Sequence, residues 1–263
     1  MNSRYIYCFN GIVKREVLRF FQQRSRLLSA LVRPLLWLVV FAAGFRSALG
    51  VSIMEPYGTY ITYQQYIIPG LCCMIILFNG MQSSLSMVYD REMGSMKVLL
   101  MSPLPRPFLL CSKLIASALL SLLQVVIFLL LAQLVDVEIP LIGYLSSIPA
   151  VFLIAFFLGA LGLMLSNLIK QLENFAGVMN FVIFPMFFLS SALYPLWKMQ
   201  EASLWLYWIC QLNPFTACVE LLRFALYGQI NLPALATVVI ATAIASSFAL
   251  FSFRPQQSQK RGS

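Results

Sequence analysis

The stretch that decides the fold is residues 90–113, DREMGSMKVLLMSPLPRPFLLCSK. It carries charges of both signs and lies between two apolar runs, each long enough to cross a bilayer. A short polar segment between two such runs must lie in water on one face of the membrane. Its pattern predicts a helix over residues 91–101 that is stopped by Pro103, Pro105 and Pro107. We therefore expect this segment to be the place where something outside the membrane acts on the chain.

The composition points to a membrane protein. The chain has 263 residues, of which 60% are hydrophobic and 10% charged, and its mean hydropathy is +0.85. Soluble domains are about 45–50% apolar and about 25% charged. We therefore predict an all-α polytopic membrane protein, a single transmembrane domain over residues 1–263, with no nucleotide-binding motif. The net charge of +9 is explained by Lys and Arg in cytoplasmic loops rather than by nucleic-acid binding.

An amphipathic helix is predicted ahead of six spans. Residues 5–28 combine apolar residues at helical spacing with a basic side, which indicates a helix lying in the interface at anionic head groups. The alternative is the cytoplasmic start of the first span. Arg33 and Arg46 leave a short apolar run between them, so we expect Arg33 to snorkel inward and Arg46 outward. The predicted spans are 31–51, 66–89, 114–135, 145–168, 175–196 and 232–253.

Residues 203–227 are too interrupted to form one span. Asn213-Pro214 divides them into two short helices, and the Trp and Tyr residues of the region prefer the membrane interface. Glu220 and Arg223 are three residues apart on one helical face, close enough to pair. We predict a re-entrant or interfacial hairpin on the outer side.

The distribution of basic residues predicts the orientation. With six spans and the amino terminus inside, 15 of the 18 Lys and Arg lie in inner segments. Only Arg46, Lys198 and Arg223 lie outside. Because Lys and Arg collect in cytoplasmic loops, both termini are predicted to be cytoplasmic.

The spans contain almost no ionisable residue, and the chain has no His. Ion-coupled carriers normally keep such groups at membrane depth, and membrane enzymes need nucleophile, base or metal constellations. An ion-coupled carrier, or a membrane enzyme acting on a lipid-linked substrate, is therefore the less favoured alternative. The six cysteines are expected to act as small buried hydrophobic residues. A disulfide between Cys210 and Cys218 is an alternative that the sequence does not decide. The energy for any work must come from a partner.

Several short motifs follow one another along residues 10–252. After the basic amino-terminal helix they are Ile68-Pro69-Gly70-Leu71, then Arg91-Glu92-Met93-Gly94-Ser95-Met96-Lys97-Val98-Leu99-Leu100 with Ser102-Pro103-Leu104-Pro105-Arg106 and Lys113, then Leu193-Tyr194-Pro195-Leu196, and Leu212-Asn213-Pro214-Phe215 with Glu220 and Arg223. Their order and spacing are more specific than any motif alone. The chain resembles an ABC-2 type permease, the membrane subunit of an ATP-binding-cassette exporter. It is most similar to the short permeases that export nodulation factors, drugs and polysaccharides.

The resemblance implies a type V (ABC-2) exporter fold in the cytoplasmic (inner) membrane of a bacterium. The chain would form a homodimer with two ATPase subunits, which would bind ATP and Mg, so that this chain itself has no cofactor, metal or catalytic residue. Residues 91–101 would be the coupling helix in a groove of the ATPase, with residues 5–28 as the connecting helix beside it. The coupling residues would be Arg91, Glu92, Gly94, Ser95, Lys97, Leu100, Pro103 and Arg106.

The resemblance also implies a substrate path at the dimer interface, lined by the second and fifth spans and capped by the hairpin 203–227. The path residues would be Asn79, Gln82, Ser83, Asn180, Phe184, Phe187 and Phe188, with ordinary helix packing as the alternative for each. Such a lining favours an amphipathic substrate, namely a lipid-linked saccharide, a lipid or a hydrophobic drug. ATP binding would drive its outward movement by alternating access.

Overall fold

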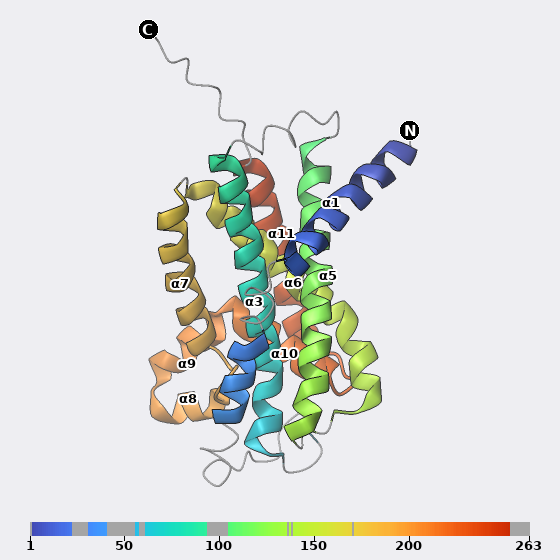
Figure 1. Cartoon of the computed structure of the whole chain (residues 1–263). Coiled ribbons are helices and arrows are strands. Elements are labelled where there is room, and N and C mark those ends of the chain that lie inside the picture. Colours follow the sequence, from blue (N-terminus) through green and yellow to red (C-terminus); the bar gives the residue numbers. More distant parts are fainter. Residues whose placement is uncertain are drawn as a thin grey trace.

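The computed structural model describes residues 2–22, 31–40, 56–57, 61–93, 105–135, 137, 139–169 and 171–252, and the regular elements within these ranges are helices (Figure 1). The elements are α1 (Asn2–Gln22), a short helix Leu31–Val40, α3 (Tyr63–Glu92), α5 (Arg106–Ala132) with the 3-10 turn η1 (Gln133–Val135), α6 (Leu141–Leu168), α7 (Leu172–Phe188), α8 (Leu196–Ala202), α9 (Leu204–Leu212), α10 (Pro214–Ala225) and α11 (Leu232–Ser252).

Four helices are long and apolar enough to cross a membrane, namely α3, α5 with η1, α6 and α11. Two shorter apolar helices, Leu31–Val40 and α7, overlap the predicted first and fifth spans. The chain is therefore a multi-pass membrane protein, as predicted, whereas the count of six spans stays a prediction. Residues 41–51 of the predicted first span, with Arg46, lie outside the described residues.

Two helices have other ends than the predicted spans, and proline explains the first difference. α5 begins at Arg106, well before the predicted third span, because proline at the N-cap (Pro105) and in the first turn needs no backbone N–H donor. α7 ends at Phe188, before the end of the predicted fifth span, and a turn follows it. A helix that the sequence did not predict, α8, then begins after Pro195.

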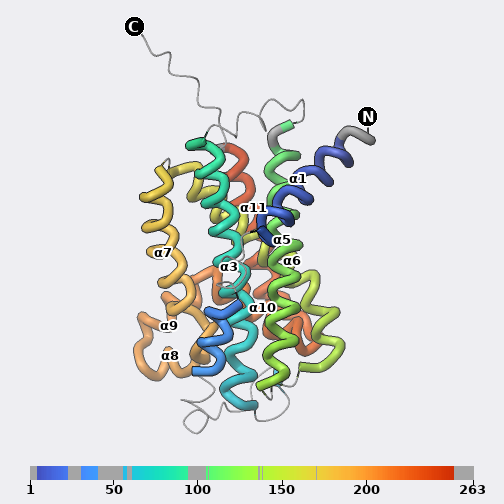
Figure 2. The backbone as a smooth tube through the Cα atoms, in the orientation of Figure 1, coloured from blue at the N-terminus to red at the C-terminus, as the bar shows by residue number. Residues whose placement is uncertain are grey.

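Helices α3, α6 and α11 all end at the same end of the bundle. Arg91, at the end of α3, donates to the Ser166 carbonyl (3.0 Å) and to Asn167 Oδ1 (3.2 Å) of α6. Asn167 in turn donates to the Ala249 carbonyl of α11 (3.2 Å). α1 lies at this end too, so both ends of the described chain are on one side of the bundle (Figure 2). Which compartment that side faces stays a prediction.

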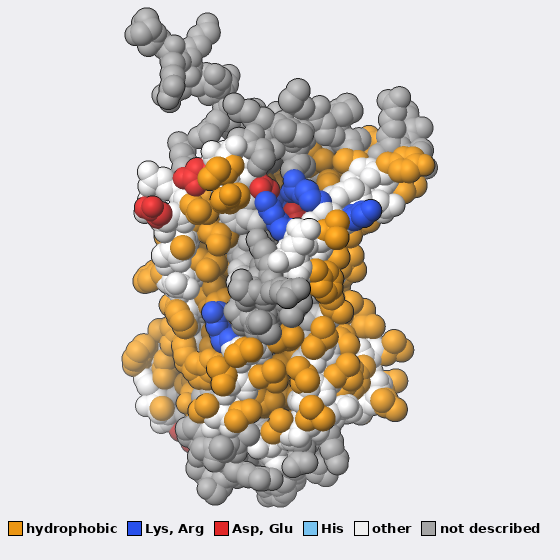
Figure 3. Space-filling view, viewed as in Figure 1, with side chains coloured by type: hydrophobic (Ala, Val, Ile, Leu, Met, Phe, Trp, Pro, Cys, Tyr) orange, Lys and Arg blue, Asp and Glu red, His pale blue; other side chains and the backbone are white. Residues whose placement is uncertain are grey.

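α3 is the central helix of the bundle. In its most apolar stretch of 18 residues, 78% of the residues are buried, whereas the corresponding share in α11 is 22%. It packs on α6 through small residues, as helices do in lipid: a Cβ on Gly162 would lie 2.5 Å from Ser84 Oγ. The surface around the bundle is a broad hydrophobic belt, and charged side chains gather at the end that holds α1 (Figure 3).

Arg33 does not lie where the sequence predicts. It was expected to reach inward to the cytoplasmic face, but its guanidinium lies 4.0 Å from the centroid of the Phe78 ring. Phe78 is at the middle of α3, so this cation lies beside the centre of the longest helix.

The close contact between Gly70 and the turn after α7 predicts a stability defect. A Cβ at Gly70 would lie 2.5 Å from the Ala192 carbonyl oxygen and 2.7 Å from its Cα, both backbone atoms. Gly70→Ala should therefore lower the free energy of unfolding by about 1–3 kcal/mol, as overpacking typically does. Chemical unfolding of the purified chain in detergent measures this. Gly11→Ala is the control, because nothing lies within 4 Å of a Cβ there; equal stability of the two variants would contradict the packing argument.

Candidate functional site

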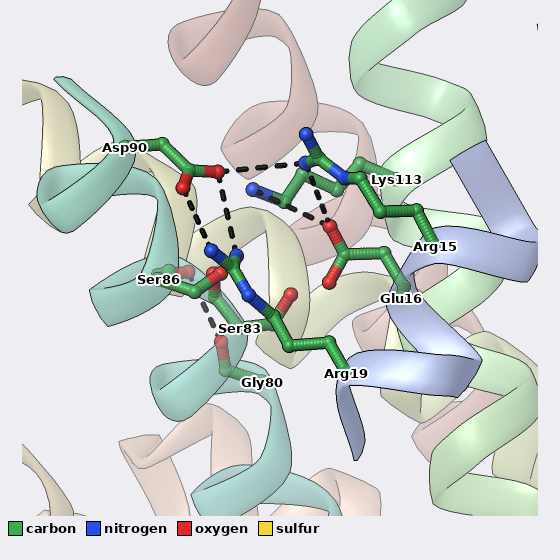
Figure 4. A network of polar contacts seen from close by, with 9 residues as sticks. Arg15, Glu16, Arg19, Gly80, Ser83, Ser86, Asp90 and Lys113 are labelled. Atoms are coloured by element: carbon green, nitrogen blue, oxygen red, sulfur yellow. Dashed lines mark hydrogen bonds and ion pairs between the residues drawn. The ribbon is translucent and has the colours of Figure 1, made fainter. Parts of the chain in front are cut away.

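A cluster of charged side chains joins α1 to α3 and α5 (Figure 4). We call it the α1 junction. α1 contributes three members, the last turn of α3 contributes an acid, and the early part of α5 contributes a lysine: Arg15, Glu16, Arg19, Asp90 and Lys113.

Asp90 is the centre of the α1 junction and is only 3% exposed. Arg19 donates to it with both Nη atoms, at 2.9 Å to Oδ1 and 3.4 Å to Oδ2, in the forked geometry that makes such pairs strong. Arg15 Nη2 lies 3.4 Å from Asp90 Oδ2 and 3.1 Å from Glu16 Oε1. Lys113 Nζ lies 4.0 Å from Glu16 Oε1. The hydrogen bond to Asp90 raises the pKa of Arg19, so that this pair stays charged.

The sequence of α1 explains how it attaches. Arg15 and Arg19 are four residues apart and therefore share one helical face. Tyr5 packs edge-on against Phe108 of α5, with ring centroids 5.1 Å apart. On the exposed side lie Ile6, Tyr7, Leu18 and Phe21. An apolar exposed face beside a charged one suits a helix that rests in the membrane interface.

The α1 junction involves both helices that flank residues 94–104. α3 ends at Glu92, two residues after Asp90, and α5 begins at Arg106, two turns before Lys113. The predicted coupling helix 91–101 does not begin separately, because its first two residues continue α3. Arg91 is directed to α6, as described above, whereas Glu92 is exposed. The other predicted coupling residues Gly94, Ser95, Lys97, Leu100 and Pro103 lie outside the described residues.

A second polar cluster lies at the opposite end of the bundle and is centred on Arg223 of α10, which is completely buried. We call it the Arg223 junction. Arg223 Nη1 is paired with Glu220, and Nη2 donates to the Ser191 carbonyl at 2.9 Å. The guanidinium lies over the ring of Tyr66 in α3, 4.1 Å from its centroid.

The turn after α7 accepts hydrogen bonds from two other parts of the chain. Tyr66 donates to the Ser191 carbonyl (3.0 Å), and Tyr63 to the Leu193 carbonyl (2.8 Å). Asn213 Nδ2 donates to the Met186 carbonyl (2.8 Å) and to the Leu189 carbonyl (2.6 Å). The start of α3, the turn and the start of α10, which are far apart in sequence, therefore meet here. Cys210 and Cys218, in the same region, are buried and free.

The predicted path residues divide into two groups. Asn79 is buried and donates to the Ser117 carbonyl (3.0 Å) and to Ser121 Oγ (2.7 Å), which makes it a contact between α3 and α5. Phe187 is buried as well. The remainder are exposed or half-buried on α3 and α7: Gln82, Ser83, Asn180, Phe184 and Phe188.

Sequence reasoning missed the α1 junction. Four of its members were seen only as loop charges or as the basic side of an amphipathic helix, and Glu16 was not singled out. A usable signal existed, because Asp90 is an acid at the end of a span and a basic helix stands elsewhere in the chain. The pairing itself required the tertiary structure.

Comparison with known proteins gives a consistent family. A family model described as "ABC-2 type transporter" matches residues 7–227. The protein "Putative transport permease ycf38" of Cyanophora paradoxa is 30% identical over 216 residues, which cover 81% of this chain and 72% of the relative. Proteins of the same name in Porphyra purpurea (29% identity, 81% and 72% covered) and Pyropia yezoensis (28%, 84% and 74%) are also similar to it.

Loss of the Asp90 charge is expected to loosen α1. In Asp90→Asn, Arg19 and Arg15 lose their buried counter-charge, and hydrogen bonds to charged groups contribute about 1.5–3 kcal/mol. Because both arginines are partly exposed, we expect a loss of about 2 kcal/mol in the free energy of unfolding, with faster proteolysis within α1. A double-mutant cycle with Arg19→Gln isolates the pair. Additive losses would contradict a direct interaction.

Lysine is not expected to replace arginine at position 223 without a loss of stability. Lysine cannot bind Glu220 and the Ser191 carbonyl with a planar fork while lying over the ring of Tyr66. Arg223→Lys should therefore cost about 2 kcal/mol of stability, measured by chemical unfolding in detergent. Lys198→Arg is the matched control, because Lys198 stands over Trp197 at 5.3 Å without a described ion pair. If Arg223→Lys left the free energy of unfolding unchanged, the positive charge alone would be enough to hold this junction together.

Proposed function

The chain belongs to the ABC-2 type transporter family of transport permeases, and from this premise we propose that it is the membrane subunit of an exporter driven by a separate ATPase. Two such chains and two ATPase subunits form the transporter, with ATP and Mg bound by the ATPase. The complex lies in the cytoplasmic membrane of a bacterium, with both termini of this chain in the cytoplasm.

The observation that carries the proposal is the α1 junction. A force applied to residues 94–104 reaches α3 and α5 directly, because these helices begin and end beside that segment. α1 is tied to both helices by the pairs of Asp90 and Lys113. The movements of α1, α3 and α5 are therefore coupled, as the transmission of a force from the ATPase requires. Exposed Glu92 is the described residue best placed to meet the ATPase.

The exposed apolar surface supports a second copy and an amphipathic substrate. α7 exposes Phe181 (79%), Phe184 and Phe188, and the helix Leu31–Val40 exposes Leu36 and Val40. Trp37 joins the two helices, with its ring centroid 5.9 Å from that of Phe188. The second copy faces this surface, and the substrate passes between the copies. Closure of the ATPase pair on ATP switches the path from inward-open to outward-open, so that the substrate leaves outward.

The coupling role of Glu92 gives a test of the proposal. In the complex reconstituted in liposomes, Glu92→Lys should lower transport at least tenfold per ATP hydrolysed, because a reversed charge misplaces the contact that transmits the movement. Co-purification shows whether the ATPase still binds, and the purified chain alone should hydrolyse no ATP.

Glu201→Lys is the matched control, since Glu201 is an equally exposed acid on α8. Normal coupling in Glu92→Lys, with the ATPase still bound, would contradict the role of this segment. ATP turnover by the isolated chain, or failure of any ATPase to bind it, would refute the proposed function.

A further inference from the structure

Arg33 is a cation beside the middle of the most enclosed helix. Its guanidinium covers the ring of Phe78 at 4.0 Å. Phe78 is 12 residues from Tyr66, at the Arg223 junction, and 12 residues from Asp90, at the α1 junction. At 1.5 Å per residue, it lies about 18 Å along the helix from each polar cluster. An arginine side chain is too short to reach either interface from there, so the charge lies near the centre of the hydrocarbon layer. Basic surface does interrupt the hydrophobic belt about halfway along the molecule (Figure 3).

The described part of the chain offers Arg33 no carboxylate as a counter-charge. Among the described residues, no Asp or Glu lies within ion-pair distance of it. None of the six predicted spans contains an acidic residue at all. A second copy of the chain therefore brings no carboxylate to this depth either. Because an arginine without a counter-charge at the bilayer centre is expensive, an anion from outside the protein is the counter-charge that the arrangement lacks.

The surroundings of Arg33 suit the head and the tail of an amphiphile. Arg33 borders a small notch between the helix Leu31–Val40 and α3, and the polar residues Asn79 and Gln82 also line it. Its own side chain is exposed, with five N–H donors that match the oxygen atoms of phosphate or carboxylate groups. The exposed apolar side chains of Leu36 and Phe188 lie on the two helices that Trp37 joins. A charged head and a hydrocarbon tail can thus be held side by side.

We propose that Arg33 is a recognition site for the anionic, phosphate-type head group of the transported amphiphile. The inference rests on the proposed function and narrows its substrate to an acyl- or prenyl-chain molecule with an anionic head. Gln82 lies at the same notch, one helical turn along α3 from Phe78. A neutral hydrophobic drug would leave the charge of Arg33 without a partner.

Native mass spectrometry of the purified chain tests the site without the ATPase. The probes are phosphatidylglycerol and phosphatidylcholine with identical acyl chains, titrated into the detergent-solubilised protein. The natural chain should retain phosphatidylglycerol roughly tenfold more strongly, and Arg33→Gln should abolish this preference. Arg33→Lys should keep part of it, because the charge remains while the fork is lost. Lys198→Gln, which also removes a cation that stands over an aromatic ring, should keep all of it.

Equal retention of both lipids, or a preference that persists in Arg33→Gln, would overturn the site. A second arm separates a cargo from a resident lipid, which share this chemistry. In liposomes containing the complex, ATP should accelerate the exchange of bound phosphatidylglycerol at least tenfold, and exchange that ignores ATP would overturn the assignment to the substrate. Head-group preference in a chain that binds no ATPase would leave the site intact while refuting the proposed function.

Discussion

Arg223 makes the interaction on which the rest of the fold depends. It is fully buried, and its guanidinium binds Glu220, the Ser191 carbonyl and the face of Tyr66 together. A buried charge is stable only when paired and hydrogen-bonded, so these partners must stay in place. They belong to α10, to the turn after α7 and to α3. One side chain therefore joins the central helix to the short helices packed over one end of the bundle.

The opposite end of the bundle is held by a more open network. The arginines of the α1 junction are partly exposed, and its charges are shared among three helices. Its carboxylates and Lys113 are buried, whereas Arg15 and Arg19 reach solvent, so salt screens these pairs more than it screens the enclosed guanidinium of Arg223. The contrast follows from burial, since the same kind of charged group stands in both places.

Between the two ends, the predicted spans hold almost no ionisable residue, whereas ion-coupled carriers normally keep such groups at membrane depth. Arg33 lies in the first predicted span, and it differs from the junction arginines because the described residues offer it an aromatic ring but no carboxylate. Its depth follows from how the helix Leu31–Val40 packs on α3. A sequence position beside the basic amino-terminal region suggested an interfacial residue, and the tertiary arrangement placed it elsewhere.

Composition and hydropathy alone determined that this is an all-helical membrane protein, because apolar runs of such length have no other stable form in lipid. Asn213-Pro214 also revealed the break between α9 and α10, since proline and N-capping act locally. Local patterns could not determine the end of α7, which is closed by the distant amide of Asn213. Nor could they show that Asp90 binds Arg19, 71 residues away, or that Asn79 binds α5. These contacts depend on which helices become neighbours, and only the packed structure decides that.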